Sequence, residues 1–272
     1  PQYIISPSAA AIKQAAQKNP GSVWLIGNEM ERYDWYLGRQ DEILPEIYAF
    51  AFRDIRAIIK AADPTAKIAL GGVIQFTPLR QQWLDRVWTQ YKLITGHAID
   101  QDIDVFNIHN FIGSERCWIA PNPLIDNRPE RTCSGMGIPV GVSGTKVGNE
   151  EYGAYVGQDN RHMDMGTPQR LGTFQEQIIN FRKWMKAKNP NNVNKPLIVS
   201  EYGALYQRLC MPGDTACVTF YQTNPLAQPW GYVDFTNPAV VQNFMVASFN
   251  WFNTATDCTL SSQSANGCKL VQ

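Results

Sequence analysis

The sequence lacks several features that mark common functional classes. Among its 272 residues, 24 Lys and Arg balance 24 Asp and Glu, whereas a nucleic-acid-binding domain normally carries a basic excess. Its longest apolar runs are about seven residues, far below the roughly 20 that a membrane helix needs. The chain starts at Pro1 without a basic and apolar leader, so no signal peptide is visible. We therefore expect no nucleic-acid partner and no membrane span.

Motifs for phosphate, serine-nucleophile and zinc chemistry are also missing. The segment GVSGTKVG, residues 141–148, contains a lysine but has neither the spacing of a phosphate-binding loop nor the helix that follows one. No Ser-His-Asp order is evident. The cysteines show no CxxC spacing of the kind that zinc sites use. The sequence thus predicts no cofactor and no metal.

The six cysteines fall into three close pairs, each bracketing a polar segment. The pairs are Cys117 with Cys133, Cys210 with Cys217, and Cys258 with Cys268. Local disulfides would close these segments and are typical of an oxidising compartment. Six cysteines admit about fifteen pairings, and unpaired thiols of a cytosolic enzyme remain the alternative. We interpret the pattern as three disulfides in an extracellular or cell-surface protein.

Apolar segments alternate with amphipathic segments along the chain, which predicts strands alternating with helices. The expected helices are 7–18, 44–64, 78–94, 172–188 and 237–256, and the expected buried strands are 23–29, 67–75, 103–111 and 195–203. Such alternation indicates a parallel sheet covered by helices, in one domain spanning 1–272. Two long connections, 112–166 and 204–236, leave the sheet at the carboxyl ends of its strands. Each is either a long loop that shapes the substrate site or a poorly ordered segment.

Two of the predicted strands end in a glutamate. Glu29 closes "VWLIGNE" and Glu201 closes "PLIVSE". Cleavage of a glycosidic bond with retention needs two carboxyl groups about 5–5.5 Å apart, one acid and one nucleophile. We expect burial to raise the pKa of the acid, whereas hydrogen bonds keep the nucleophile ionised. A single strand-end glutamate would more simply be a loop-capping or ion-paired residue, but two of them favour the catalytic interpretation.

The segments "WLIGNE", "FNIHNF" and "PLIVSEYG" resemble strands four, six and seven of the clan A glycoside hydrolases, which are retaining (β/α)8-barrel (TIM-barrel) enzymes. Within the clan the chain looks closest to uncharacterised bacterial members. The resemblance implies that Glu29 is the general acid/base and Glu201 the nucleophile. It further implies that Asn28 donates to the sugar 2-hydroxyl and that His109 lines the subsite.

Four further residues are predicted to bind substrate. Tyr202 adjoins Glu201 and could replace the tyrosine that many clan members carry where this chain has Phe111. Trp35 follows Glu29 closely, and Trp118 lies in the long connection 112–166. Gln75 ends the second predicted strand and is the weakest of the four.

The predicted barrel is incomplete. The matching segments cover about strand three or four to helix seven, so strands one, two and eight have no counterpart in this chain. Because an open barrel fragment would expose sheet edges, we expect either that this is a partial chain or that another polypeptide completes the barrel. The predicted function is hydrolysis of a poly- or oligosaccharide. The alternative is a catalytically inactive barrel relic that binds carbohydrate or serves a structural role in a surface assembly.

Overall fold

The computed structural model describes residues 3–32, 42–122, 128–154, 163–167, 169–204, 206–207, 214–223, 233–234, 238–262 and 267–272. Its α-helices are α1 (Ala9–Lys18), α2 (Pro45–Ala62), α3 (Pro78–Thr95), α4 (Thr173–Lys188), α5 (Thr215–Thr223) and α6 (Pro238–Thr254), with 3-10 helices η1 (Ile99–Asp102) and η4 (Pro190–Asn194). Its strands are β1 (Val23–Asn28), β2 (Lys67–Gly72), β3 (Phe106–His109), β4 (Glu115–Asn122), β5 (Arg128–Gly135), β6 (Thr145–Val147), β7 (Glu150–Tyr152), β8 (Leu197–Glu201), β9 (Tyr206–Gln207) and β10 (Val233–Asp234). The fold is mixed α/β, and every helix and strand predicted from the alternating pattern is present.

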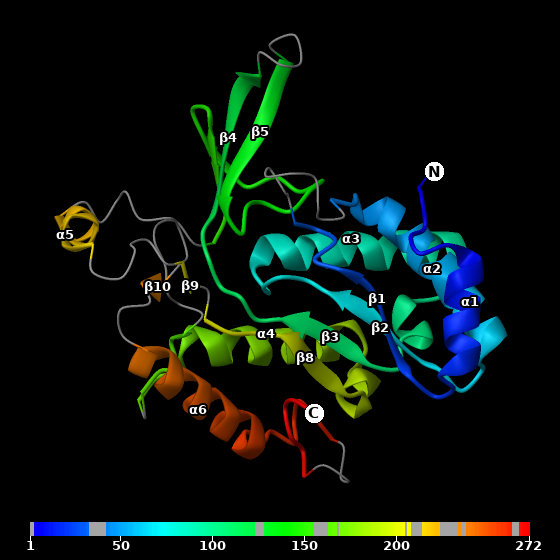
Figure 1. Cartoon of the computed structure of the whole chain (residues 1–272). Coiled ribbons are helices and arrows are strands. Elements are labelled where there is room, and N and C mark those ends of the chain that lie inside the picture. The colour runs from blue at the N-terminus through cyan, green and yellow to red at the C-terminus, as the bar shows by residue number, and fades with distance from the viewer. Residues whose placement is uncertain are drawn as a thin grey trace.

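Four parallel strands form the layer that carries the predicted site. β1 pairs with β2, and β3 pairs with β8, both in parallel. The two pairs are joined by a parallel bridge between Ala69 and Val105 and by a hydrogen bond from His109 N to Val73 O (3.0 Å). The strands therefore follow the chain order β1, β2, β3, β8, and Figure 1 shows them side by side. Their carboxyl ends consequently lie at one edge of the layer.

The helices that connect these strands have clear sequence boundaries. α2 and α3 both begin with a proline at the first helical position, where the missing N–H is not needed. Thr77 caps α3 with its side chain, and Gly96 ends that helix in the left-handed conformation (φ 81°). Tyr48 of α2 ties the helix to the strand layer, because its hydroxyl donates to Ile26 O (2.7 Å) and accepts from Gly71 N (3.1 Å).

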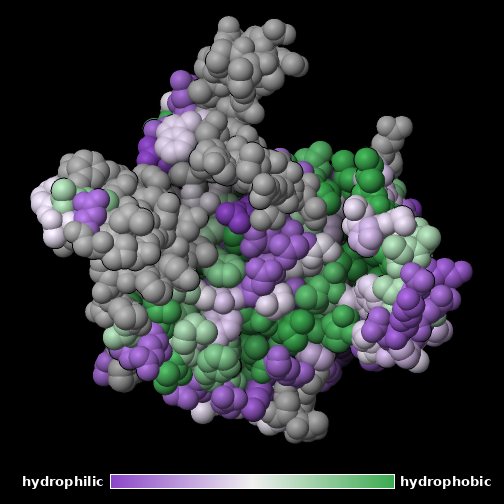
Figure 2. Space-filling model, in the orientation of Figure 1, coloured by the Kyte–Doolittle hydropathy of each residue, from purple (hydrophilic) through white to green (hydrophobic). Residues whose placement is uncertain are grey.

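β1 differs from the buried strand that the sequence predicts. Val23 is 50% exposed and Leu25 is 42% exposed, and Figure 2 shows apolar surface in the region of the strand layer. No strand among the described residues lies beyond β1, so this edge and part of its face are uncovered. The described residues form small sheets and no closed barrel.

The connection 112–166 is not the structureless loop that its sequence suggests. It contains a four-stranded antiparallel sheet in the order β5-β4-β7-β6, which we call the arm and which projects from the strand layer (Figure 1). Cys117 and Cys133 lie directly opposite each other in the arm. Its strands were missed because cross-strand pairing and a disulfide hold them, rather than an alternation of apolar residues.

Two of the three predicted disulfides are present, Cys117–Cys133 and Cys258–Cys268. Cys217 is also disulfide-bonded, and its predicted partner Cys210 lies outside the described residues. Across the described part of the chain, no helix combines the length and apolarity needed to cross a bilayer. The two disulfides are compatible with a secreted protein.

Candidate active site

The carboxyl ends of three strands bring together three ionisable side chains. Glu29 directly follows β1, His109 ends β3 and Glu201 ends β8. One side-chain oxygen or nitrogen from each lies within 4.8 Å of the others. Glu29 and His109 are buried, whereas Glu201 is half-exposed, with 46% of its side chain accessible. Residues separated by 172 positions in the sequence thus share one site.

His109 lies between the two carboxylates. Its Nδ1 is 3.1 Å from Glu29 Oε1, and its Nε2 is 3.6 Å from Glu201 Oε1. A neutral imidazole carries one N–H, and only the shorter contact has hydrogen-bond length. We therefore assign the proton to Nδ1, which donates to Glu29. Nε2 faces Glu201, and in the neutral imidazole it directs its lone pair to that side.

Gly72, the last residue of β2, makes room for this imidazole. A Cβ at position 72 would lie 2.2 Å from His109 Cδ2 and 2.5 Å from His109 Nε2. Real Cβ contacts are not that short, so any side chain here would displace the ring. The close approach of β2 to His109 thus depends on glycine.

The backbone of Glu29 is unusual. Its φ is 45°, in the left-handed region that residues other than glycine seldom adopt. The conformation is held by a hydrogen bond from Glu29 N to Gly72 O (2.9 Å) and by one from Arg32 N to Glu29 O (2.9 Å). Such strained conformations are concentrated at functional sites.

The charge state of Glu29 differs from that expected of a resting general acid. Burial raises the pKa of its carboxyl, but the hydrogen bond from His109 and the charge of Arg32 outweigh burial, and the pKa is lowered. Arg32 Nη1 lies 3.0 Å from Glu29 Oε2. Glu29 is therefore ionised at neutral pH in the free protein. The expected raised pKa is absent because Arg32 folds back onto the carboxylate, a contact that no sequence pattern indicates.

The other predicted site residues are distributed differently. Asn28 is exposed at the end of β1. Trp35 lies outside the described residues. Gln75 is fully buried, where it donates to Glu115 Oε1 (3.1 Å) and accepts from Gly113 N (2.9 Å). These contacts place Gln75 at the base of the arm.

The predicted aromatic residues pack against other parts of the molecule. Tyr202 stacks edge-on with Phe252 at 5.1 Å and contacts Phe174 at 5.8 Å, between β8 and the helices. Trp118 lies on the arm, where its indole N–H donates to Glu150 (3.1 Å). Phe111 meets His109 edge-on at 6.4 Å. None of these contacts of Tyr202 or Trp118 involves either strand-end glutamate.

Sequence reasoning missed a buried charge cluster close to Glu29. Arg80, at the start of α3, donates to Glu31 Oε1 (3.1 Å) and to Glu115, and all three side chains are fully buried. Arg80 also donates to Met136 O (2.7 Å) at the end of β5. We call these three residues the Arg80 cluster. It fixes the base of the arm to the loop that follows Glu29, and nothing in the sequence pattern pairs these residues.

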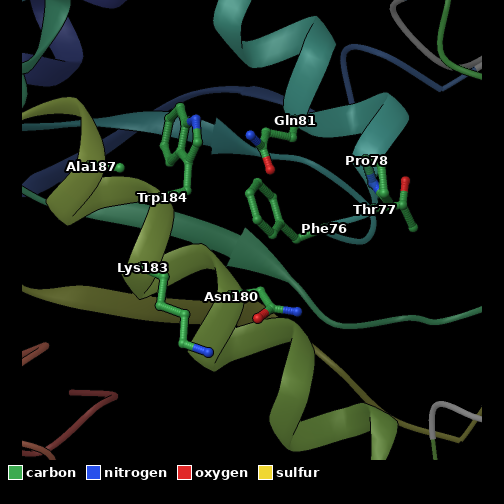
Figure 3. Close-up of a pocket in the computed structure, with 8 residues that line it drawn as sticks. All are labelled: Phe76, Thr77, Pro78, Gln81, Asn180, Lys183, Trp184 and Ala187. Atoms are coloured by element: carbon green, nitrogen blue, oxygen red, sulfur yellow. The ribbon is translucent and has the colours of Figure 1, made fainter.

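Two pockets lie elsewhere in the described structure. One of about 330 Å³ lies between α3 and α4 (Figure 3). Its lining residues are Phe76, Thr77, Pro78, Gln81, Asn180, Lys183, Trp184 and Ala187. The other, of about 340 Å³, is largely apolar and lies between residues 3–6, β1 and α2. Neither is lined by Glu29, His109 or Glu201.

Comparisons with known proteins give little support for a functional assignment. No protein-family model matches the chain, and no curated protein matches it. Among solved structures it is similar to AbfB, a family 51 α-L-arabinofuranosidase from Bifidobacterium longum, with 14% identity and a TM-score of 0.35. The match covers 88% of this chain and 38% of that one, so the chain spans well under half the length of its neighbour. At this similarity, the site geometry is the basis for any functional assignment.

Proposed function

We propose that the chain carries the catalytic carboxylates of a retaining glycoside hydrolase that acts on a poly- or oligosaccharide. The observation that supports this most is the placement of Glu29 and Glu201, whose oxygens lie within 4.8 Å at the carboxyl edge of parallel strands. Retention by double displacement requires two carboxyl groups at about this separation, with no room for a water molecule between them.

Glu201 is the nucleophile in this proposal, because its carboxylate is half-exposed and accessible to a sugar carbon. Glu29 is the acid/base. Because its pKa is lowered in the free protein, Glu29 needs to gain a proton when the sugar binds. Contact between sugar and Arg32, which is partly exposed, would weaken the ion pair and raise the pKa of Glu29. In this proposal Asn28, which is exposed and precedes Glu29, donates to a sugar hydroxyl.

The same ion pair favours a second candidate function. A carboxylate that stays paired with Arg32 cannot donate a proton, and the chain would then be an inactive barrel relic that binds carbohydrate or serves a structural role. The two functions are separated by measuring hydrolysis.

We also propose that the four parallel strands are part of a (β/α)8 barrel. The exposed Val23 and Leu25 on β1 support completion of the barrel by further polypeptide, since strands in such barrels are covered on both faces. The two disulfides support an extracellular or cell-surface location.

The proposal is tested by incubating the full chain with a panel of 4-nitrophenyl glycosides and soluble polysaccharides. We expect hydrolysis of at least one substrate, and proton NMR of the first-formed product should show the anomer of the substrate. Formation of the opposite anomer would contradict the retaining mechanism. No hydrolysis across the panel, together with retained binding to a polysaccharide, would favour the relic.

Arg32→Gln is expected to shift the pH dependence of hydrolysis. A positive neighbour favours the ionised carboxylate, so its removal raises the pKa of Glu29. The alkaline limb of kcat/KM, which reports the acid of the free enzyme, should therefore move to higher pH. Arg53→Gln, which breaks a surface ion pair with Asp54, should leave the profile unchanged. An unchanged limb in Arg32→Gln would mean that Glu29 is not the proton donor.

A further inference from the structure

The contact between His109 and Glu201 leaves a gap suited to a cation. In the neutral imidazole with its proton on Nδ1, which is the form that binds a metal ion, the Nε2 lone pair of His109 points toward Glu201 Oε1, 3.6 Å away. This distance is too long for a hydrogen bond, and two facing acceptors repel each other. A cation between them would remove the repulsion.

The opposite side of the imidazole is already arranged as it is in metal-binding histidines. Such histidines almost always donate their other ring N–H to a carboxylate or carbonyl, which fixes the tautomer and the ring orientation. Here the Nδ1–H donates to Glu29 Oε1 (3.1 Å), and Glu29 is itself held by Arg32. The orientation of the ring, and with it the position of Nε2, is therefore fixed without a bound ion.

A buried amide beside Nε2 points independently to a ligand. Asn107 precedes His109 by two residues on β3 and is 2% exposed, and among the described residues neither of its amide atoms has a hydrogen-bond partner. The point that a Cβ on Gly72 would occupy lies 2.5 Å from His109 Nε2 and 3.1 Å from Asn107 Nδ2. The amide therefore adjoins Nε2, and a half-turn about its last torsion would present the oxygen there. Buried polar groups are normally paired.

The distances fit a small transition-metal ion. Zinc binds nitrogen at about 2.0–2.1 Å and carboxylate oxygen at about 2.0–2.2 Å. Two ligand atoms 3.6 Å apart would then subtend an angle of roughly 120° at the ion. The imidazole nitrogen favours zinc and other transition metals over calcium and magnesium, which take oxygen ligands almost exclusively. The carboxylate and amide oxygens supply the remaining ligands.

We propose that His109 Nε2, the Glu201 carboxylate and the Asn107 amide oxygen form a site for one divalent transition-metal ion, best suited to zinc, with Glu29 orienting the imidazole. The expectation from cysteine spacing was that no metal binds, and this site uses no cysteine. Binding is independent of the proposed hydrolase. If the chain is that hydrolase, an ion on Glu201 blocks the nucleophile, so zinc inhibits in competition with the sugar.

The test is isothermal titration of Zn2+ into the EDTA-treated full chain, with the visible absorption of Co2+ as a second readout. We expect one Zn2+ per chain with a dissociation constant in the micromolar range or below, and a Co2+ band showing nitrogen and oxygen ligands. His109→Gln should weaken binding at least tenfold, and so should Asn107→Ala. Glu29→Gln should weaken it by about 10- to 100-fold, the usual cost of losing an orienting partner.

His97→Gln is the matched control. His97 Nε2 also lies beside a carboxylate, Asp102 Oδ2 (2.7 Å), but this half-buried pair adjoins η1, which precedes β3, whereas His109 ends β3. The control should bind Zn2+ like the unchanged chain. Equal affinity of the unchanged chain and His109→Gln, or no Co2+ band in the unchanged chain, would overturn the proposal. Turnover measured in EDTA reports on the hydrolase separately, so either proposal can fail alone.

Discussion

Glu201→Gln is expected to lower kcat by at least about a thousandfold, the scale typical of removing a nucleophile. Glutamine has the same shape but cannot form the covalent glycosyl intermediate. The folded state should be unaffected, because the Glu201 side chain is half-exposed and its closest ionic contact, to His109 Nε2, is 3.6 Å long. The measurement is kcat on the best substrate of the glycoside panel, with circular dichroism to verify folding.

Glu176→Gln provides the comparison for this variant. Glu176 is exposed on α4, and the same chemical change there should leave kcat within a factor of two or so of the unchanged chain, as for most surface substitutions. A loss of less than tenfold in Glu201→Gln would remove Glu201 from the role of nucleophile.

Arg80→Met is expected to destabilise the protein by about 3–5 kcal/mol, the usual cost of removing one partner from a buried ion pair. Arg80 and Glu115 are both fully buried, and Glu115 would lose its compensating charge. The free energy of unfolding from urea titration measures the effect. Arg86→Met lies on the same helix but breaks an exposed pair with Glu46, and it should cost less than about 1 kcal/mol. Equal losses in the two variants would show that burial of the Arg80 cluster does not increase its contribution to the free energy of unfolding.

Glu31→Gln should be tolerated much better than Arg80→Met. The cluster has two carboxyl groups for one guanidinium, and burial raises the pKa of Glu31 despite the charge of Arg80. Glu31 thus tends to keep its proton, and glutamine resembles the protonated form. A raised pKa in the folded state means that stability is lost as the pH rises through that pKa. Glu31→Gln should therefore remove the loss of stability that the unchanged chain shows as the pH rises above the ordinary glutamate pKa of 4.5, and a variant that is less stable at every pH would contradict the assignment.

The strand and helix order could be predicted from the sequence, because apolar runs and helical periodicity are local signals. The helix predicted at 78–94 extends over Pro78–Thr95, since Pro78 and Gly96 mark its ends. The meeting of Glu29 and Glu201 also followed from sequence, since parallel strands place their carboxyl ends at one edge. These features depend only on where strands begin and end.

Features that depend on side-chain contacts between distant segments could not be predicted. The arm is held by cross-strand pairs and the disulfide Cys117–Cys133, which leave no periodic pattern. The ion pair of Arg32 with Glu29 depends on a backbone reversal after β1, and it changes the charge state expected for the acid. Gln75 ends the second predicted strand, where substrate ligands are expected, but its side chain is buried and donates to Glu115 in the interior.

The glycine at position 72 has a consequence for judging related sequences. Because the imidazole of His109 occupies the space of a Cβ there, a protein could retain both glutamates and the histidine and still be unable to assemble the site. A sequence comparison that considers only the two glutamates would not detect this loss of the site. Glycine at position 72 is therefore as necessary to the arrangement of His109 and the two glutamates as those residues themselves.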